Sequence, residues 1–596
     1  MAYGKVARRG GGFGLLTSGA IAVVLVGGLA SVGPDASAGA STQDATVSSF
    51  RAVPASLGSS GGQVKLVARV TGATSCKFTS KPKYAGLPLT VACSNGTVTT
   101  TVTVPANVAT TTVQDHFALV VTSHGGARLV AKTEVSLAPG PAATGIVSVS
   151  SNYDSSCALL STGGVDCWGD NPYGELGNGT VAGPDGQDGY DTPEAVTGIT
   201  NAISVSSDGY GSYCAVLSTG AVDCWGDNQY GELGNGTVGG PDGEDGYDTP
   251  QAVTGITNAT SVSTTDGGVG YCTVLSTGGG ECWGYNGSGQ VGNGTTSGPD
   301  GEYGYDTPQP VTGLTNAVSV SSYTYGNCAV LSSGGVDCWG NNSWGQVGNG
   351  TLGGPEDVGY DTPQTVAGLA DAVSVTNDGY GSYCALLSTG AVDCWGENVY
   401  GELGNGTTDG PDGNYGYDTA QAVTGLTTAV SVASDGYGSY CALLSTGGVD
   451  CWGENQYGQV GNGTTDGPDG EYGYDTPQAV TGLTTAVSVP SAGYGSYCAL
   501  LSTGGIDCWG YNDYGQVGNG TTDGPDGEYG YDTTQEVGHL TRAISMSGSN
   551  DNSCAVLSTG AAKCWGDNQY GELGNGTTGG PDGAYGYDTP HSVSAA

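Results

Sequence analysis

The chain has 596 residues, of which 113 are Gly, 35 are Tyr and only 4 are His, and 56 acidic against 13 basic residues give a net charge of −43. So much Gly with so few Lys and Arg excludes a helical protein. The charge excludes a nucleic-acid-binding surface, because phosphate contacts depend on Lys and Arg. The even number of 18 Cys favours an oxidising compartment.

Charge also divides the chain into two parts. Residues 1–144 contain 11 of the 13 basic residues and all four Phe, whereas residues 145–596 contain only Arg542 and Lys563 against 52 acidic residues, a net of −50. An asymmetry of this size predicts separate domains.

The first 40 residues have the pattern of a secretory signal peptide. Lys5, Arg8 and Arg9 form a basic start, residues 15–32 are an apolar run, and Ala36 and Ala38 form a small-residue cleavage motif. An uncleaved membrane anchor is the alternative, although several Gly in the run weaken it. We therefore expect a secreted or cell-surface bacterial protein with no membrane contact beyond the signal peptide.

Residues 42–140 are predicted to form a small β-sandwich. Residues 63–70, 97–104 and 118–122 alternate apolar and polar side chains, with turn-forming segments between them. We expect Cys76 and Cys93 to form a disulfide. The size, the strand spacing and this single pair resemble bacterial immunoglobulin-like modules, although no Trp lies between the two Cys. A linker rich in Pro and Ala follows at residues 138–142.

Residues 145–596 repeat eight times. The tripeptide Cys-Trp-Gly recurs every 56 to 58 residues, beginning at Cys167, Cys224, Cys282, Cys338, Cys394, Cys451, Cys508 and Cys564. In the repeat that begins at Asp371, short strands are predicted at residues 372–375, 383–387, 391–397 and 419–423, and no helical periodicity is present. Four strands per repeat predict an all-β fold, an eight-repeat β-propeller preceded by the sandwich.

The repeat C-A-L-L-S-T-G-G-V-D-C-W-G-x-N-x-x-G-[EQ]-[LV]-G-N-G-T resembles that of the regulator of chromosome condensation family. The resemblance covers all eight units and implies a ring of four-stranded blades. The family usually has seven, and eight repeats predict eight here. If the T-P-Q-A-V strand joins the following hairpin, residues 588–594 would close the ring onto the first unit.

What the family does carries over only in part. Its namesake is a guanine-nucleotide exchange factor for a nuclear GTPase, a role that does not suit an exported acidic chain. A secreted bacterial β-lactamase inhibitor with this fold docks a loop face onto an enzyme, and this precedent supports a secreted binding propeller. Fold alone does not identify the target.

Each repeat contains two Cys separated by nine residues, with an S-T-G-G turn between them. A hairpin folded at that turn places the two Cys opposite each other, within disulfide reach. Zinc is disfavoured, because each Cys pair supplies only two of four ligands. The expected disulfides are Cys157–Cys167, Cys214–Cys224, Cys272–Cys282, Cys328–Cys338, Cys384–Cys394, Cys441–Cys451, Cys498–Cys508 and Cys554–Cys564.

Strand topology predicts which loops share a face. In an up-and-down meander alternate connections emerge on one side, so the D-G-Y-G-S-Y loop and the long Asp-rich loop lie together. Loops on a rigid scaffold carry function, and Tyr provides contact area at low entropy cost. The candidate binding residues are Tyr210, Tyr380, Tyr437 and Tyr494 in the first loop, Tyr247, Tyr305, Tyr417, Tyr474 and Tyr531 in the second, and the loop residue Trp344. Alternatively, each Tyr packs its own Gly-rich loop.

The acidic loops also suggest calcium. Candidate ligands are Asp412, Asp418, Asp469, Asp475, Asp526 and Asp532, whereas Asx turns would explain the same residues without a metal. No Ser/His/Asp set can be assembled from four His, which disfavours an enzyme, although carboxylate pairs for glycoside chemistry stay open. The sequence thus predicts an exported propeller that binds an extracellular protein or glycan. The alternatives are a calcium-stabilised adhesive surface protein and, third, an enzyme.

Overall fold

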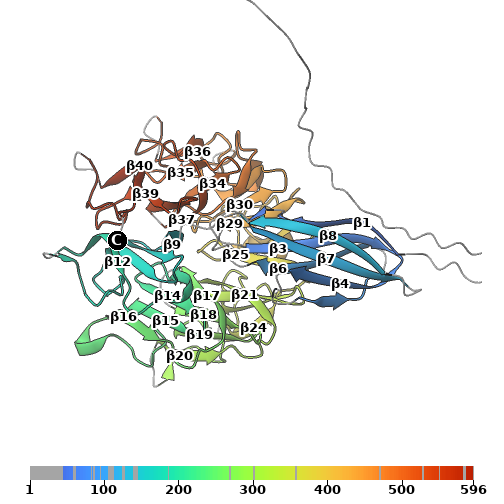
Figure 1. Ribbon diagram of the computed structural model, residues 1–596, viewed down its shortest axis with the longest axis horizontal. Helices are drawn as coiled ribbons and strands as arrows, with labels where there is room; N and C mark the ends of the chain where they lie inside the picture. Colours follow the sequence, from blue (N-terminus) through green and yellow to red (C-terminus); the bar gives the residue numbers. More distant parts are fainter. Residues whose placement is uncertain are drawn as a thin grey trace, which may run out of the picture. The chain divides into compact units, whose positions relative to one another are not determined.

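The structure is a computed structural model (Figure 1). It describes residues 45–54, 56–57, 62–81, 84, 87–93, 96–104, 113–123, 128–137, 145–184, 187–266, 270–299, 303–355, 359–468, 472–525, 529–549, 551–581 and 585–594. The predicted signal peptide lies outside these residues. Contacts divide the chain into two compact parts, one with the N-terminal strands and one with the repeats. Within the described ranges, no helix is long and apolar enough to span a membrane.

The N-terminal part consists of two antiparallel sheets. Its strands are β1 (Thr46–Val53), β2 (Ser56–Leu57), β3 (Gly62–Thr71), β4 (Ala73–Lys81), β5 (Leu89–Val91), β6 (Gly96–Val104), β7 (Val113–Ser123) and β8 (Arg128–Leu137). One sheet has the order β1-β3-β6 and the other β2-β8-β7-β4-β5. Alternate residues such as Leu66 and Leu119 are fully buried, and the Phe50 and Phe78 rings meet at 6.2 Å between the sheets. The predicted Cys76–Cys93 disulfide is present.

The second part contains eight repeat units of four strands each, which the colours of Figure 1 follow from β9 to β40. Units 1 to 4 are β9 (Ile146–Ser151), β10 (Ser155–Leu160), β11 (Val165–Asp170), β12 (Gly189–Ala195); β13 (Ala202–Ser207), β14 (Ser212–Leu217), β15 (Val222–Asp227), β16 (Gly246–Ala252); β17 (Ala259–Asp266), β18 (Gly270–Leu275), β19 (Gly280–Tyr285), β20 (Gly304–Pro310); and β21 (Ala317–Tyr323), β22 (Gly326–Leu331), β23 (Val336–Asn341), β24 (Gly359–Thr365).

Units 5 to 8 repeat the pattern. They are β25 (Ala372–Asn377), β26 (Ser382–Leu387), β27 (Val392–Glu397), β28 (Gly416–Ala422); β29 (Ala429–Ser434), β30 (Ser439–Leu444), β31 (Val449–Glu454), β32 (Gly473–Ala479); β33 (Ala486–Ser488), β34 (Ser496–Leu501), β35 (Ile506–Tyr511), β36 (Gly530–Glu536); and β37 (Ala543–Gly548), β38 (Asn552–Leu557), β39 (Ala562–Asp567), β40 (Gly586–Ser592). Short 3-10 turns lie at Pro241–Gly243 and Pro411–Gly413.

Each unit is an antiparallel meander whose first strand is innermost. Successive first strands contact one another from β9 to β29, β33 contacts β30, β37 contacts β34, and β37 contacts β9. The fold is therefore a closed β-propeller, as predicted. The fourth strand pairs with the third strand of its own unit, and β40 likewise pairs with β39. Residues 588–594 thus do not complete the first unit, and the ring closes by packing between its first and last units.

A Trp hydrogen bond joins each unit to the one before it. The Cys-Trp-Gly Trp is buried, and its indole N–H donates at 2.6–2.8 Å to the backbone carbonyl of the Glu or Gln in the preceding unit's G-[EQ]-[LV] turn. The bond from Trp168 to Glu572 closes the ring. The turn must approach closely, since a Cβ on Gly571 would lie 2.6 Å from the Asp191 Cα in the first unit. Glycine at this point is therefore a packing requirement.

All eight predicted repeat disulfides are present. The paired Cys lie directly opposite each other on the second and third strands, with Cα atoms 4.0–4.1 Å apart. They belong to the apolar layers between units, in which Cys157, Leu159 and Cys167 of the first unit pack against Trp225 of the second.

Replacing Cys384 and Cys394 together by Ala should lower the free energy of unfolding of the propeller by about 3 kcal/mol, because the unfolded chain loses a closed loop. Guanidinium unfolding followed by Trp fluorescence measures this, since all nine Trp lie in the repeats. Replacing Cys76 and Cys93 by Ala is the control and should leave the Trp transition in place. An unchanged midpoint in the first variant would contradict the prediction.

Candidate functional site

The D-G-Y-G-S-Y loops are organised by their own Asp. Asp378 is buried, and its Oδ1 accepts the backbone N–H groups of Tyr380, Gly381 and Ser382 at 2.9–3.0 Å. The Ser382 hydroxyl donates to Asp378 Oδ2 and lies 2.9 Å from the Tyr440 hydroxyl of the next unit. This Asp is therefore committed to its loop, as Asx-turn chemistry predicts. The same network recurs around Asp208 and Asp435.

Replacing Asp435 by Ala should destabilise the propeller by about 1–3 kcal/mol, because the Tyr437 and Ser439 N–H groups and the Ser439 hydroxyl lose their acceptor. Unit 7 has Ala492 at this position, and its first strand, β33, is only three residues long. Thermal unfolding measures the loss. Ala492→Gly, which removes no acceptor side chain, is the control, and an equal effect of both changes would contradict the capping role.

The two sets of predicted Tyr differ in exposure. Tyr210 is 62% exposed and Tyr380 is 51% exposed, whereas Tyr437 and Tyr494 are half-buried against one another. Every predicted Tyr of the long loop is half-buried, and its hydroxyl lies 2.9–3.2 Å from a Thr hydroxyl of the same loop (Tyr247, Tyr305, Tyr417, Tyr474 and Tyr531). Loop packing, the alternative weighed for each Tyr, thus describes the long-loop set.

The exposed aromatic residues of the long loop are not the predicted Tyr but their near neighbours in the sequence. They stand two residues before the packed Tyr and are 56–70% exposed (Tyr303, Tyr415, Tyr472 and Tyr529), as is Tyr585 in the last unit. The E-Y-G-Y-D spacing does not indicate this by itself, because residues i and i+2 of a strand lie on the same side only if the strand continues through both. Here the strand begins at the intervening Gly.

Five Tyr form a continuous aromatic patch on units 5 to 7: Tyr380, Tyr437, Tyr457, Tyr494 and Tyr511. Their ring centroids are 4.0–6.1 Å apart from neighbour to neighbour. Trp344, 37% exposed, lies beside the patch against Gly381. Trp344 occupies the place that Tyr400 and Tyr457 take in the N-x-Y-G segment of their units.

The W-G-x-N Asn, which the sequence analysis did not single out, shapes the turn beside these residues. It is fully buried in all eight units. In unit 5, Asn398 accepts the Leu403 N–H at Oδ1 and donates from Nδ2 to the carbonyls of Thr407 and Asp409. Its conserved spacing within the repeats was the available signal.

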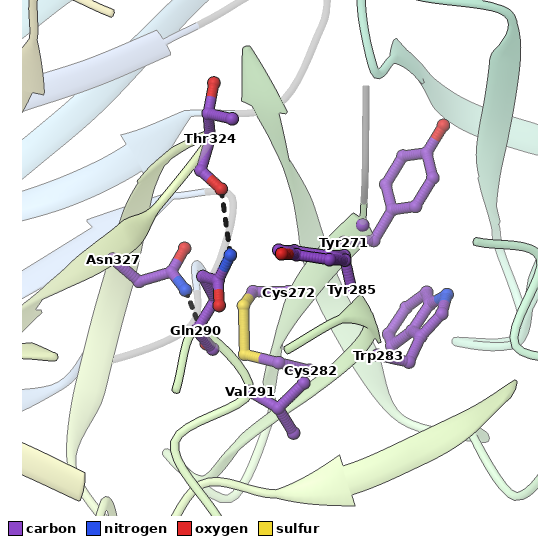
Figure 2. A pocket seen from close by; sticks show the side chains of 10 residues that line it. Tyr271, Cys272, Cys282, Trp283, Tyr285, Gln290, Val291, Thr324 and Asn327 are labelled. Carbon is purple, nitrogen blue, oxygen red and sulfur yellow. Dashed lines mark hydrogen bonds between the residues drawn. A yellow bond between two sulfur atoms is a disulfide. The ribbon is translucent and has the colours of Figure 1, made fainter. Parts of the chain in front are cut away.

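The G-[EQ]-[LV] residue also has a side-chain role. Figure 2 shows Gln290 in unit 3, whose Nε2 donates to the Thr324 carbonyl while its backbone carbonyl accepts from Asn327 Nδ2. Its Oε1 accepts the backbone N–H of Ser288. Four units have Glu here instead (Glu175, Glu232, Glu402 and Glu572), and each Glu accepts the equivalent N–H. Oε1 of Glu232 and of Glu572 is buried without a hydrogen-bond partner.

A pocket of about 190 Å³ lies between units 5 and 6, lined by Glu397, Glu402, Glu454, Tyr380, Tyr400, Tyr437, Gly438 and Gln456. Burial, reinforced by the nearby negative charge of Asp378, raises the pKa of Glu397 to about 8. Burial and then the charge of Asp435 do the same for Glu454. Burial raises the pKa of Glu402 well above its ordinary value. The repeats contain only two basic residues, Arg542 and Lys563, and neither lines the pocket.

The propeller should lose stability as the pH rises from about 5 to 8. Carboxyl groups whose pKa is higher in the folded state bind protons more tightly there, so their favourable contribution is complete below the unfolded pKa near 4 and disappears through the folded pKa near 8. Thermal unfolding across this range measures it. Glu397→Gln should raise the melting temperature at pH 8 but not at pH 5. A melting temperature that rises with pH would contradict this.

The predicted calcium ligands do not converge in the described part of the chain. Asp418, Asp475 and Asp532 lie on the fourth strands, where each backbone carbonyl accepts a Gly N–H of the preceding unit at 2.8 Å. Asp469 and Asp526 lie outside the described residues, as does the side chain of Asp412. Within the described ranges, no three His, Cys, Asp or Glu residues gather to hold a metal ion.

Family comparison agrees with the repeat. The sequence model of the regulator of chromosome condensation (RCC1) repeat matches residues 146–175, 202–232, 429–459, 491–516 and 543–572, and a second model of this repeat matches residues 446–500. These matches include units 1, 2, 6, 7 and 8.

Similar proteins come from a plant and from mammals. The ultraviolet-B receptor UVR8 of Arabidopsis thaliana is 27% identical over 55% of this chain and 69% of its own length. The secretion-regulating guanine nucleotide exchange factor of Mus musculus is 26% identical over 61% and 77%. The E3 ubiquitin-protein ligase HERC2 of Homo sapiens is 31% identical over 33% of this chain but only 4% of its own length.

Solved structures are similar at low identity. Yeast RCC1 (Prp20), in its complex with Kap60, is 20% identical with a TM-score of 0.48 over 63% of this chain and 83% of its own. Human WBSCR16 has the same identity and TM-score over 63% and 95%. Units 1, 2, 6, 7 and 8 carry segments that match the regulator of chromosome condensation repeat, and the strand pairing of the eight units makes the β-propeller.

Proposed function

We propose that the protein is a non-catalytic binding propeller, which engages an extracellular protein or glycan through the loop face. This face is the end of the propeller that carries the D-G-Y-G-S-Y loops and the long loops. The main support for this proposal is the aromatic patch of units 5 to 7, which lies beside an acidic pocket on disulfide-bonded strands. Exposed Tyr on a rigid scaffold binds at low entropy cost.

Action outside the cytoplasm is part of this proposal. Its support is the nine disulfides, with no free Cys in the described part of the chain, because such bonds persist in oxidising compartments. The face opposite the loop face has a different character. There the first strands begin, and Ile203, Val318 and Val487 are 51–55% exposed. These residues supply a matched control for loss of large exposed side chains.

The test compares two triple variants with the unaltered protein on a glycan array and in pull-down from culture medium, followed by affinity measurement on each purified hit. The first variant replaces Tyr210, Tyr380 and Tyr325 by Ala, of which Tyr325 is 48% exposed in the corresponding loop of unit 4, between β21 and β22. Affinity should fall about tenfold or more, because exposed aromatic residues dominate binding energy. The control replaces Ile203, Val318 and Val487 by Ala and should bind normally.

Binding lost only in the control would place the interface on the opposite face and contradict the proposal. A ligand bound equally by both variants would do the same. The glycan array separates the two classes of partner.

A further inference from the structure

We infer that the pocket between units 5 and 6 binds an ammonium or guanidinium group, the head of a Lys or Arg side chain that a protein partner presents. This inference rests on the proposed function in one respect, namely that a protein partner supplies the cationic side chain. It narrows the partner from a protein or glycan to a protein with an exposed basic side chain.

The lining has the chemistry of a cation site. Three carboxyl groups and three phenol rings surround the pocket. The Tyr380 and Tyr437 rings stand nearly perpendicular, at 88° with centroids 5.4 Å apart, so they present faces in two directions. Aromatic faces attract cations within about 6 Å, and ammonium groups are recognised by cages of such rings. Carboxylates complete the site with charge-assisted hydrogen bonds.

One carboxyl group lacks a partner at the pocket. Glu402 is only 2% exposed. Its Oε2 accepts the Tyr400 N–H at 2.8 Å. The carboxyl oxygen without a partner is Oε2 of Glu397, which also lines the pocket and is buried with no hydrogen bond among the described residues. Gly438 lines the pocket as well, and a Cβ there would lie 3.9 Å from Glu402 Oε1 and 3.4 Å from Glu454 Oε2. The missing side chain at Gly438 thus leaves both oxygens facing space that a ligand can enter.

The negative charge of Glu402 is not required by the fold. At the same position of other units, Gln346 and Gln459 accept the equivalent backbone N–H at 2.8 Å. A neutral acceptor therefore suffices for the turn. Burial favours the neutral form of this carboxyl group, and a cation bound beside it would favour the ionised form.

The size and spacing of the pocket favour an organic cation over a metal. No three acidic side chains in the described ranges converge as a metal requires. The volume of about 190 Å³ is smaller than the roughly 300–1,000 Å³ of ordinary ligand pockets. It suits a single side-chain head group. A neutral sugar donates hydroxyl hydrogen bonds to carboxyl groups but brings no positive charge to favour their ionised form.

The test titrates the full chain at pH 8 and low salt with the peptides acetyl-Gly-Arg-Gly-amide and acetyl-Gly-Lys-Gly-amide, using calorimetry. The neutral probe is acetyl-Gly-Gln-Gly-amide. The charged peptides should bind and the neutral one should not. Glu402→Gln should weaken binding about tenfold or more, the loss expected for a hydrogen bond to a charged group. Tyr437→Ala should weaken it as well.

Glu175→Gln is the matched control, because it makes the same change at the same turn position of unit 1 and removes the same charge. It should bind the charged peptides normally. Equal weakening by Glu175→Gln would reveal a general charge effect and overturn the inference, as would unaltered binding by Glu402→Gln. Thermal unfolding of each variant verifies folding.

Failure of this inference is distinguishable from failure of the proposed function. If the Arg peptide binds through Glu402 while the loop-face Tyr variant retains every macromolecular ligand, the pocket stands and the proposed function fails. If the loop face binds a partner and Glu402→Gln leaves the Arg peptide unaffected, only the pocket inference fails. A neutral oligosaccharide that displaces the Arg peptide from the unaltered protein and binds Glu402→Gln equally well would also overturn it.

Discussion

The indole-to-carbonyl hydrogen bond between successive units is the contact on which the rest of the propeller depends. Each bond buries a Trp and holds the neighbouring G-[EQ]-[LV] turn by its backbone, and the bond from Trp168 to Glu572 makes the ring continuous. A bond to a backbone carbonyl specifies where the turn lies but leaves the side chain of the turn residue free to vary. The contact that closes the ring therefore also places the Glu or Gln side chain of each turn at the edge of the loop face.

The acidic residues of the repeats therefore fall into two groups, the Asp residues that shape the loops and the Glu residues at the turns. The Asp residues of the D-G-Y-G-S-Y loops are surrounded by donors, as Asp378 shows. They shape loops and have little capacity left for a ligand. The Glu residues at the turn share an acceptor role with Gln in half of the units. The turn does not require the charge of these Glu residues, and the repeats contain only two basic residues, Arg542 and Lys563.

Much of the fold was predictable because the same pattern of strands and turns occurs in eight copies. Strands predicted at 372–375 and 383–387 correspond to β25 and β26, and the Cys spacing alone indicated the disulfides. The site was less accessible. Tyr417 was chosen, yet its neighbour Tyr415 is exposed, because strand β28 begins between them and turns Tyr417 onto the core. A single-sequence pattern does not show this, because both residues are Tyr and lie two positions apart in the same loop motif.

The pocket was beyond sequence reasoning for a different reason. Glu397 and Glu402 belong to one unit, whereas Tyr437 and Glu454 belong to the next, and only the docking of two units brings them together. A repeat pattern describes what units share, but this pocket arises from what adjacent units do not share. Unit 5 supplies Glu at the turn where units 4 and 6 have Gln346 and Gln459. The binding specificity of a repeat propeller therefore depends on sequence differences between adjacent units. The contacts that all units share keep the ring closed.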